Sequence, residues 1–590
     1  MTNPTTTEST PVLIVGGSLV GLSAAVFLAW RGVPVVLVDK HRGSSLHPRA
    51  IGYTTRTLEL FRATGVEVPE SLQGNTPPRR ARVASLAGTW FEEYPWTPGG
   101  ARPDIEYSPV RATAIPQDRL EPILRERALE LGVELWLGTE LIDFTQDDDG
   151  VTAVLRRRED GHEYRLRARY LVAADGAGSG IREALGIGRH GEGLLSTQRS
   201  ILFTAPLDTY LVHGVVQFEI EQPGFRTFLT TYSDGRWVLM LADDIDRDAD
   251  EQRALVRKAI GRTDIPIELI TVGRWELAAL IADRFSAGRV FLAGDAAHQL
   301  PPNRGGFGAN TGIEDAHNLA WKLAAVLSGE AAPALLDTYD AERRAIAELR
   351  HEQLFARADY KAYLKTPKSG VPILDDVAVE LGQLYRSTAI LGTDPELPPA
   401  RRPEEWAGQP GTRAPHLWVL LGDKEMSTLD LFGRGWVLLS EDERWADALV
   451  RPGIPVQSGV EGKPLEPSAF RGGETRRYAP MSVRSSDFRV AEARPDALMP
   501  SDLLGLEAKS MDPNVFRAAD ARAGNPLSFV HIGVDAKPLE PNAFRVTYGL
   551  GASGAVLVRP DGYIAWRAVD APADPARALA DALHLITSGE

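Results

Sequence analysis

The chain has 590 residues, of which 43% are hydrophobic and 25% are charged, and its net charge is −15. That length exceeds what one hydrophobic core fills, so we expect a globular protein of several domains. The acidic balance disfavours a nucleic acid or an anionic membrane as partner, because phosphate groups need a basic face. The sequence contains no cysteine. This excludes disulfides, thiolate metal sites and iron–sulfur clusters, so any redox chemistry has to come from a bound cofactor.

The uncharged stretch Ser9–Trp30 is long enough to span a membrane or to form the core of a signal peptide. Two features argue against both. Residues 1–8 contain no lysine or arginine, and Gly16, Gly17 and Ser18 interrupt the stretch. We therefore expect a cytoplasmic protein that does not insert into a membrane.

The same stretch is better explained as the start of a βαβ unit. Residues Pro11–Val15 form a short β-branched apolar run, which is typical of a strand buried on both faces. A helix is expected over Val20–Arg31, and a second strand over Val33–Val38 ends on Asp39. Such a unit binds the pyrophosphate of a dinucleotide at the helix N-terminus.

The turn between this strand and helix follows most of the dinucleotide-binding pattern G-x-G-x-x-G. Gly16 and Gly21 occupy the first and third glycine positions, whereas Ser18 replaces the middle glycine. Serine is small, and Gly17 beside it keeps the turn flexible. Asp39 stands where a carboxylate accepts hydrogen bonds from the adenosine ribose. The unit alone does not separate FAD from NAD(P).

Two later motifs favour a flavin. The run Arg169–Ala174 leads into Asp175-Gly176, and the run Arg289–Ala293 leads into Gly294-Asp295. An aspartate at such a strand end can bind the ribityl chain of FAD. The glycine-rich loop 305–312 then opens a helix, whose N–H groups and dipole suit the negatively charged edge of a reduced flavin. A nicotinamide-dependent dehydrogenase explains the first unit but leaves Gly294-Asp295 unexplained.

The three motifs Gly16–Gly21, Asp175-Gly176 and Gly294-Asp295 resemble, in order and spacing, the fingerprints of the class A flavoprotein monooxygenases, or FAD-dependent aromatic hydroxylases. Within that family the chain looks most like the hydroxylases of aromatic polyketides, which carry a C-terminal thioredoxin-like domain. Residues 427–433 and 558–562 resemble parts of that domain.

The resemblance implies an α/β fold with a Rossmann-type FAD-binding domain, an interleaved α+β substrate domain as in p-hydroxybenzoate hydroxylase, and a C-terminal thioredoxin-like domain. The expected division is an FAD-binding domain at 1–190 with a substrate-domain excursion near 80–105, a substrate-binding sheet at 191–274, the rest of the FAD-binding domain at 275–395, a linker at 396–411 and the thioredoxin-like domain at 412–590.

The last domain is expected to contain an insert at about 460–530 with an internal duplication. Lys463–Arg471 recurs with few changes as Lys537–Arg545. Two copies are too few to stack into a repeat array, so an enlarged loop is the simpler interpretation. A dimer contact or a cover over the active site is the alternative. Without cysteine, the domain is expected to be structural or dimer-forming rather than redox-active.

The resemblance also implies the reaction. FAD is held non-covalently, NADPH is preferred over NADH as the reductant, and O₂ forms a flavin C4a-hydroperoxide that hydroxylates a polycyclic aromatic, polyketide-like substrate. Baeyer–Villiger or oxidative ring-cleaving chemistry on the same flavin remains open, as does a non-catalytic flavoprotein that binds a polycyclic ligand. A monomer and a homodimer are both compatible with the sequence.

The candidate cofactor-binding residues come from the motifs and from the resemblance. They are Gly16, Gly17, Ser18, Gly21, Asp39, Lys40, Arg49, Gln117, Asp175, Gly176, Gly294, Asp295, Gly305, Gly308, Ala309 and Asn310. By the same resemblance, Arg49 lies beside the flavin or the nicotinamide, and Gln117 touches the FAD. Two residues separate Pro302 from Gly305 where the family usually has one, which leaves the placement of that loop open.

Catalysis is expected to centre on the flavin, with Arg49, His298 and Pro302 as candidate contributors. A histidine at a helix start is more often satisfied by backbone groups, which weakens the case for His298. Alternating runs within 191–274 make four side chains candidate substrate contacts, namely Phe218, Phe228, Tyr232 and Met240. No spacing of histidines indicates a metal site.

Overall fold

The structure is a computed structural model that describes residues 8–47, 49–69, 79–95, 105–302, 306–357, 364, 370–450 and 527–589. The chain divides into two compact units, residues 1–459 with 526–590, and residues 460–525. All described residues belong to the first unit. Among them, no helix is both long and apolar enough to cross a membrane, and the stretch Ser9–Trp30 forms a strand, a turn and a helix.

A mostly parallel sheet forms the N-terminal half of the molecule. Its main path runs through β16 (Ser286–Ala287), β17 (Val290–Leu292), β10 (Glu163–Ala173), β1 (Glu8–Val15), β2 (Val35–Asp39) and β7 (Glu134–Leu137). The strands from β17 to β7 are parallel, and β8 (Thr139–Gln146) and β9 (Val151–Arg157) continue from β10 as an antiparallel hairpin. Residues 12–14 and 171–173 are fully buried, as the apolar runs predict for strands covered on both faces.

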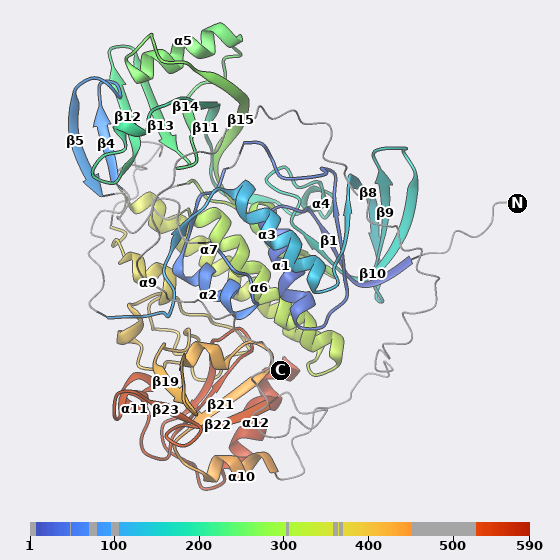
Figure 1. Cartoon of the computed structure of the whole chain (residues 1–590). Helices are drawn as coiled ribbons and strands as arrows, with labels where there is room; N and C mark the ends of the chain where they lie inside the picture. Colours follow the sequence, from blue (N-terminus) through green and yellow to red (C-terminus); the bar gives the residue numbers. More distant parts are fainter. Residues whose placement is uncertain are drawn as a thin grey trace, which may run out of the picture. The chain divides into compact units, whose positions relative to one another are not determined.

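Helices and a short ribbon surround this sheet. α1 (Leu19–Trp30) packs against α3 (Gln117–Glu130) and α6 (Phe307–Ser328), as Figure 1 shows. The other helices here are α2 (Thr55–Ala63), α4 (Gly180–Ala184), α7 (Thr338–Ala356) and α9 (Asp376–Leu381). β3 (Gly52–Tyr53) and β6 (Thr113–Ala114) form a two-stranded antiparallel ribbon. Parallel strands bring all their carboxyl ends to one edge, where a ligand site is expected.

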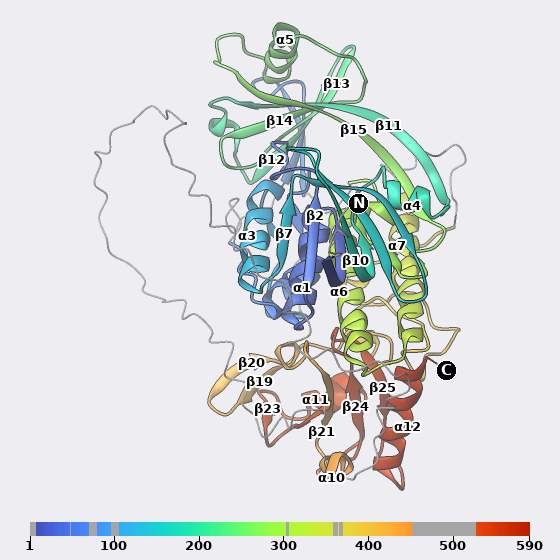
Figure 2. The ribbon, with the colours of Figure 1, turned by 90° about the vertical axis from the view of Figure 1, so that its right-hand side faces the viewer.

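A second sheet is almost entirely antiparallel. Its order is β18 (His298–Gln299), β15 (Glu268–Ala282), β11 (Arg189–Thr204), β14 (Arg236–Leu241), β13 (Phe225–Thr231), β12 (Val215–Gln222), β4 (Arg79–Val83) and β5 (Trp90–Pro95). Figure 2 shows α5 (Ala249–Ile260) over one face of this sheet. Val256 and Ile260 of α5 join the core formed by that face, so only the other face is left for a ligand.

The predicted boundary at residue 274 falls inside β15, which continues to Ala282. The reason is that β11 and β15 pair along nearly their whole length and run from the second sheet into the first domain, where β15 also pairs with β18. The expected excursion near 80–105 corresponds to β4 and β5, and residues 96–104 lie outside the described residues.

The C-terminal domain has the thioredoxin-like fold that the sequence predicts. A four-stranded sheet runs in the order β22 (Leu527–His531), β21 (Trp436–Ser440), β24 (Ala555–Val558) and β25 (Ile564–Ala568). β21 and β22 are parallel, and the other two pairs are antiparallel. α10 (Arg444–Val450) and α12 (Pro575–Ser588) pack together, and a smaller sheet joins β20 (Lys424–Ser427), β19 (Trp418–Leu421) and β23 (Ala536–Pro538).

Residues 396–411 were expected to be a linker, but they are packed into the domain. Ala400 bridges Gln383, and the buried Trp406 donates from its indole Nε1 to the Gly382 carbonyl at 2.8 Å. A Cβ on Gly408 would lie 2.3 Å from the Tyr548 carbonyl oxygen. The proline- and arginine-rich composition that suggests a linker here belongs to a closely fitted connection.

The duplicated peptide is partly visible. Its second copy, Lys537–Arg545, supplies the end of β23 and the start of α11 (Ala543–Tyr548), and Phe544 is buried in the domain core. The first copy, Lys463–Arg471, lies outside the described residues. β22 starts at Leu527, inside the predicted insert of 460–530, so the insert ends earlier than expected.

Deleting residues 460–525 should leave a folded protein, because every described strand of the C-terminal domain lies outside that range. A longer deletion, 460–545, removes β22, β23 and the buried Phe544, and should abolish cooperative unfolding of the domain. Circular dichroism and thermal melting of the two variants beside the wild type distinguish these outcomes. Loss of cooperative melting in the shorter deletion would place 460–525 in the core.

Candidate active site

A cavity of about 2590 Å³ lies where the two sheets meet. Its walls include the carboxyl ends of β1, β2, β10 and β17, the ribbon β3–β6, the first turn of α6 and one face of the second sheet. Pockets for one drug-sized ligand typically measure about 300–1,000 Å³. This cavity therefore has room for a dinucleotide and a second ligand together.

The turn after β1 has the geometry that a pyrophosphate site requires. Gly16 has φ +109°, and a Cβ on Gly21 would lie 1.8 Å from the Gly16 carbonyl oxygen, so neither position accepts a side chain. Ser18 has φ −93° in extended backbone, which any residue adopts. Its hydroxyl donates to Glu121 Oε1 at 2.7 Å. Serine at the middle position of the motif is thus compatible with the turn.

Asp39 closes the same turn from the end of β2. Its Oδ2 accepts a hydrogen bond from the Gly17 backbone N–H at 2.5 Å, and its Oδ1 accepts one from the His41 N–H at 2.6 Å. A Cβ on Gly17 would lie 3.0 Å from the Asp39 Cβ. Asp39 and Lys40 both line the cavity, which is where a ribose-binding acid is expected.

Gln117 connects this turn to the segment that carries Arg49. Its amide Nε2 donates to Ser18 Oγ at 3.0 Å and to Glu121 Oε1 at 2.7 Å. Its Oε1 accepts hydrogen bonds from the backbone N–H groups of Arg49 and Ala50, at 3.4 Å and 3.3 Å. Sequence reasoning missed Glu121, although it lies one helical turn after Gln117 on α3.

The acids of the two later motifs have oxygens that protein groups leave unsatisfied. Asp175 Oδ1 is buried and has no hydrogen-bond partner among the described residues, and neighbouring Gly176 has φ +86°. The Asp295 side chain opens to the cavity and makes no hydrogen bond within the described part of the chain. Desolvation by the surrounding cavity walls raises the pKa of Asp295, against the opposing effects of His298 and Arg49. Ligand hydroxyl groups would satisfy these acceptors, so the site fits the ribityl and ribose groups of FAD.

His298 is not a cavity residue, which corrects its candidacy as a catalytic group. It is buried, and its Nε2 lies 2.6 Å from Asp315 Oδ2. The same Asp315 oxygen accepts a hydrogen bond from the Gly294 N–H at 3.2 Å. His298 and Asp315 therefore hold the turn that presents Asp295, behind the cavity wall.

The glycine-rich segment is described from residue 306 onward, so Gly305, Asn303 and Arg304 lie outside the described residues. Gly308, Ala309 and Pro302 line the cavity as expected. Asn310 differs: its Nδ2 donates to the Gly52 carbonyl at 3.1 Å, and its Oδ1 accepts from the Thr54 N–H at 3.0 Å. Its side chain ties α6 to the ribbon instead of facing the cavity.

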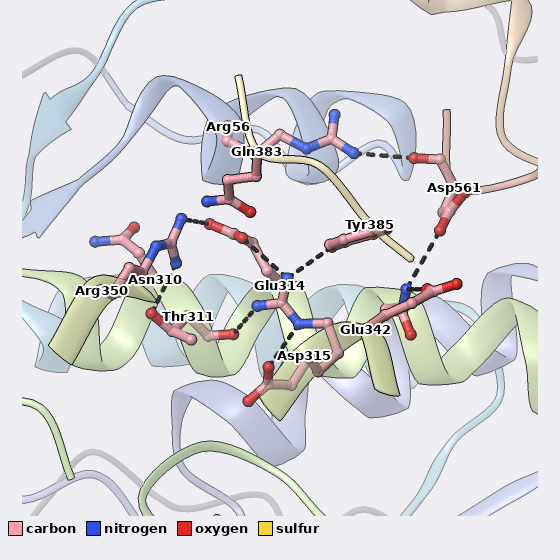
Figure 3. Close-up of polar contacts among 12 residues, drawn as sticks. Arg56, Asn310, Thr311, Glu314, Asp315, Glu342, Arg350, Gln383, Tyr385 and Asp561 are labelled. Carbon is pink, nitrogen blue, oxygen red and sulfur yellow. Dashed lines mark hydrogen bonds and ion pairs between the residues drawn. The ribbon is translucent and has the colours of Figure 1, made fainter. Parts of the chain in front are cut away.

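Buried ion pairs between α6 and α7 hold the first turns of α6 in place. Arg350 donates to Glu314 Oε1 at 2.7 Å, and Arg343 donates to Asp315 Oδ1 at 2.8 Å and to the Tyr385 hydroxyl at 2.6 Å. Figure 3 shows Glu314 and Asp315 on α6, with Arg350 reaching Glu314. All five side chains are buried, so each charge depends on its partner.

The face of the second sheet that lines the cavity carries apolar and aromatic side chains together with polar ones. Phe228 and Met240 are direct cross-strand partners, and both line the cavity together with Tyr232. Phe218, also predicted as a substrate contact, points to the opposite face, where its ring packs edge-on to Trp90 at 5.5 Å. Alternation along the strands decides this, because Phe218 pairs with Leu229 and not with Phe228.

Arg80 and Glu380 also line the cavity, but no motif in the sequence indicates them. Arg80 donates from Nε and Nη2 to Gln217 Oε1, at 3.0 Å and 2.8 Å, and its guanidinium lies 5.5 Å from the Phe228 ring centroid. Glu380 on α9 accepts a hydrogen bond from the Arg56 backbone N–H at 3.2 Å. Burial raises the pKa of Glu380 to about 7. Their placement depends on packing between distant segments.

Comparison with known proteins agrees with this geometry. The model of the FAD binding domain family matches residues 9–353, and that of the aromatic-ring hydroxylase C-terminal family matches residues 505–588. The chain belongs to the FAD-dependent aromatic-ring hydroxylases. The predicted family, the FAD cofactor and the monooxygenase class are thereby confirmed, and the dehydrogenase alternative is wrong.

Individual members of this hydroxylase family match over almost the whole chain. The 4-methyl-5-nitrocatechol 5-monooxygenase of Burkholderia sp is 38% identical, over 99% of this chain and 100% of the relative. The tetracenomycin A2 monooxygenase-dioxygenase of Streptomyces glaucescens is 35% identical, over 99% and 98%. The crystal structure of aklavinone-11 hydroxylase with FAD and aklavinone is 32% identical, covers 99% of this chain and 100% of its own, and has a TM-score of 0.78.

Replacing Asp295 by alanine should weaken retention of FAD. The ribityl hydroxyl groups would lose the carboxylate that accepts their hydrogen bonds. We expect a loss of at least about tenfold in affinity, measured as FAD released on gel filtration and by titration of the apoprotein. Asp246→Ala, a change at an exposed acid outside the cavity, is the control. A full complement of tightly bound FAD in Asp295→Ala contradicts the assignment.

Glu380→Gln tests whether burial raises the pKa of Glu380. The pKa of Glu380 is raised from 4.5 to about 7, so ionising it opposes folding, and this penalty grows as the pH rises from 4.5 to about 7. Glutamine removes the penalty. The melting temperature of the FAD-saturated variant, relative to wild type, should therefore be higher at pH 8 than at pH 5. An equal difference at both pH values means that Glu380 titrates normally.

Proposed function

We propose that the protein hydroxylates a polycyclic aromatic substrate, with FAD as cofactor, NADPH as preferred reductant and O₂ as oxidant, in the cytoplasm. One observation carries the proposal. The cavity that holds the three FAD motifs is continuous with the face of the second sheet that carries Phe228 and Met240, and its volume of about 2590 Å³ exceeds what FAD alone needs. Relatives named for tetracenomycin and aklavinone, both multi-ring compounds, support this substrate class.

The residues that would hold FAD follow from the cavity geometry. Its phosphates would face the N–H groups of Ser18 and Leu19 at the start of α1, its ribose Asp39, and its ribityl chain Asp295. Bound FAD supplies the electron transfer and the oxygen activation, which this chain's side chains cannot perform. Arg49 is exposed to the same cavity and makes no side-chain hydrogen bond among the described residues. Its charge would balance negative charge on the reduced cofactor.

The second sheet would bind and orient the substrate. Phe228 and Met240 offer a flat apolar surface on which aromatic rings pack, and this contact excludes water. Gln217 and Thr230 stand in the same wall and can hydrogen-bond ring oxygens. Glu380, whose pKa burial raises to about 7, can accept or donate a proton near neutral pH.

The reaction is tested by turnover with labelled oxygen. We expect aklavinone or a dihydroxyanthraquinone to accelerate NADPH oxidation by about tenfold or more, and one atom from ¹⁸O₂ to appear in a hydroxylated product. NADH and 4-methyl-5-nitrocatechol, a single-ring compound, are the comparison reductant and substrate. An inserted ester oxygen assigns Baeyer–Villiger chemistry instead. Hydrogen peroxide as sole product across the panel contradicts the proposal and favours a flavoprotein that only binds its ligand.

A further inference from the structure

One strip of the cavity wall is formed by residues 105–108, which we call the wall strip. All of its members line the cavity, as do residues 110–114, which lead into and include β6. β6 pairs with β3, and β3 is tied to α6 through the hydrogen bond from Asn310 to the Gly52 carbonyl. The wall strip is therefore continuous with the ribbon beside the glycine-rich turn of the FAD site.

The polar groups of the wall strip are held from the C-terminal part of the chain. The Trp418 indole Nε1 donates to Glu106 Oε2 at 3.0 Å. Arg413 Nη2 donates to the Tyr107 carbonyl oxygen at 2.8 Å, and the Tyr107 hydroxyl donates to Glu404 Oε2 at 2.7 Å. Residues some 300 positions away in the chain thus hydrogen-bond both the backbone and the side chains of the wall strip.

Arg413 fixes a second wall at the same time. Its Nε donates to Glu59 Oε2 at 2.9 Å and its Nη2 to the other carboxylate oxygen, a bidentate pair that is almost fully buried. Burial alone would raise the pKa of Glu59, but Arg413 and Arg56 lower it, so the carboxylate stays charged. Glu59 lies on α2, whose neighbouring residues Thr55 and Leu58 line the cavity.

We propose that the C-terminal domain acts as a specificity element of the hydroxylase, with Arg413 as the positioning residue that holds the wall strip and α2 at the edges of the substrate cavity. Packed protein transmits small displacements, so the two walls limit the size of the polycycle that the cavity admits. The substrate class rests on the proposed function; the role of the wall does not. This role needs no thiol, in keeping with a thioredoxin-like fold without cysteine.

Two variants test the wall without removing a charge. Arg413→Lys keeps the cation beside Glu59 but loses the guanidinium fork that reaches both Glu59 and Tyr107. Trp418→Phe keeps an aromatic side chain, smaller than the indole, and loses the hydrogen bond to Glu106. Arg62→Lys is the control, because Arg62 on α2 also makes two hydrogen bonds to a carboxylate of the C-terminal domain, that of Asp430, but does not touch the wall strip. This pair is less buried than the pair of Arg413 and Glu59.

Two measurements on the FAD-loaded proteins decide the question. The first is quenching of the bound flavin's fluorescence by iodide, which needs no substrate. The second is the ratio of the dissociation constants for aklavinone and a smaller dihydroxyanthraquinone, from changes in the flavin spectrum. We expect both wall variants, but not Arg62→Lys, to increase iodide quenching and to change the ratio by about threefold or more, with FAD content unchanged.

The outcomes separate this proposal from the proposed function. Quenching that is the same in wild type and wall variants overturns the role of the wall. So does an equal change in Arg62→Lys, which would indicate general loosening between α2 and the C-terminal domain. If neither polycycle perturbs the wild-type flavin, the proposed substrate class fails, while the iodide measurement still decides whether the C-terminal domain forms the wall.

Discussion

The arrangement of the FAD site depends on one buried carboxylate, Asp315 on α6. It accepts a hydrogen bond from the Gly294 N–H, lies 2.6 Å from His298 Nε2 and accepts another from Arg343. Burial alone would raise the pKa of Asp315, but His298 and Arg343 lower it. Gly294 lies two residues after the end of β17, and Asp315 belongs to α6. This carboxylate therefore joins the turn that presents Asp295 to the helix whose first turn lines the cavity. Removing one partner from such a buried group typically costs about 3–5 kcal/mol.

Buried charged groups also pair between α6, α7 and the C-terminal domain. Glu342 on α7 accepts hydrogen bonds from Lys322 at 2.9 Å and from Arg559 at 2.6 Å, and Asp561 accepts one from the Trp321 indole at 3.1 Å. Burial lowers the pKa of Lys322 to about 8, so its charge at neutral pH depends on Glu342. These groups supply for one another the hydrogen bonds that water would otherwise make. Each pair also fixes how the helix is aligned with the C-terminal domain, which apolar packing alone does not specify.

Sequence reasoning succeeds where the pattern is local and fails where the outcome depends on distant partners. The glycines of the first turn, Asp39 and Asp295 are recognisable because strand, turn and helix follow one another directly in the chain. Phe218 and Phe228 look alike in sequence, but the pairing with Leu229 and the packing of α5 decide which of them faces the cavity. Arg413, which hydrogen-bonds the wall strip, lies 354 positions from its partner Glu59, and no local pattern indicates such a pair.

The replaced glycine shows what the dinucleotide-binding motif requires physically. Position 16 needs a positive φ and position 21 needs the absence of a Cβ, whereas position 18 is extended and needs only a small side chain. Serine meets that need and adds a hydroxyl, which donates to Glu121 and accepts from Gln117. Gln117 in turn accepts from the backbone on either side of the Arg49–Ala50 peptide. A departure from the motif that keeps its geometry therefore adds a hydrogen-bonded chain, which runs from the turn after β1 through Gln117 to the backbone of Arg49 at the cavity wall.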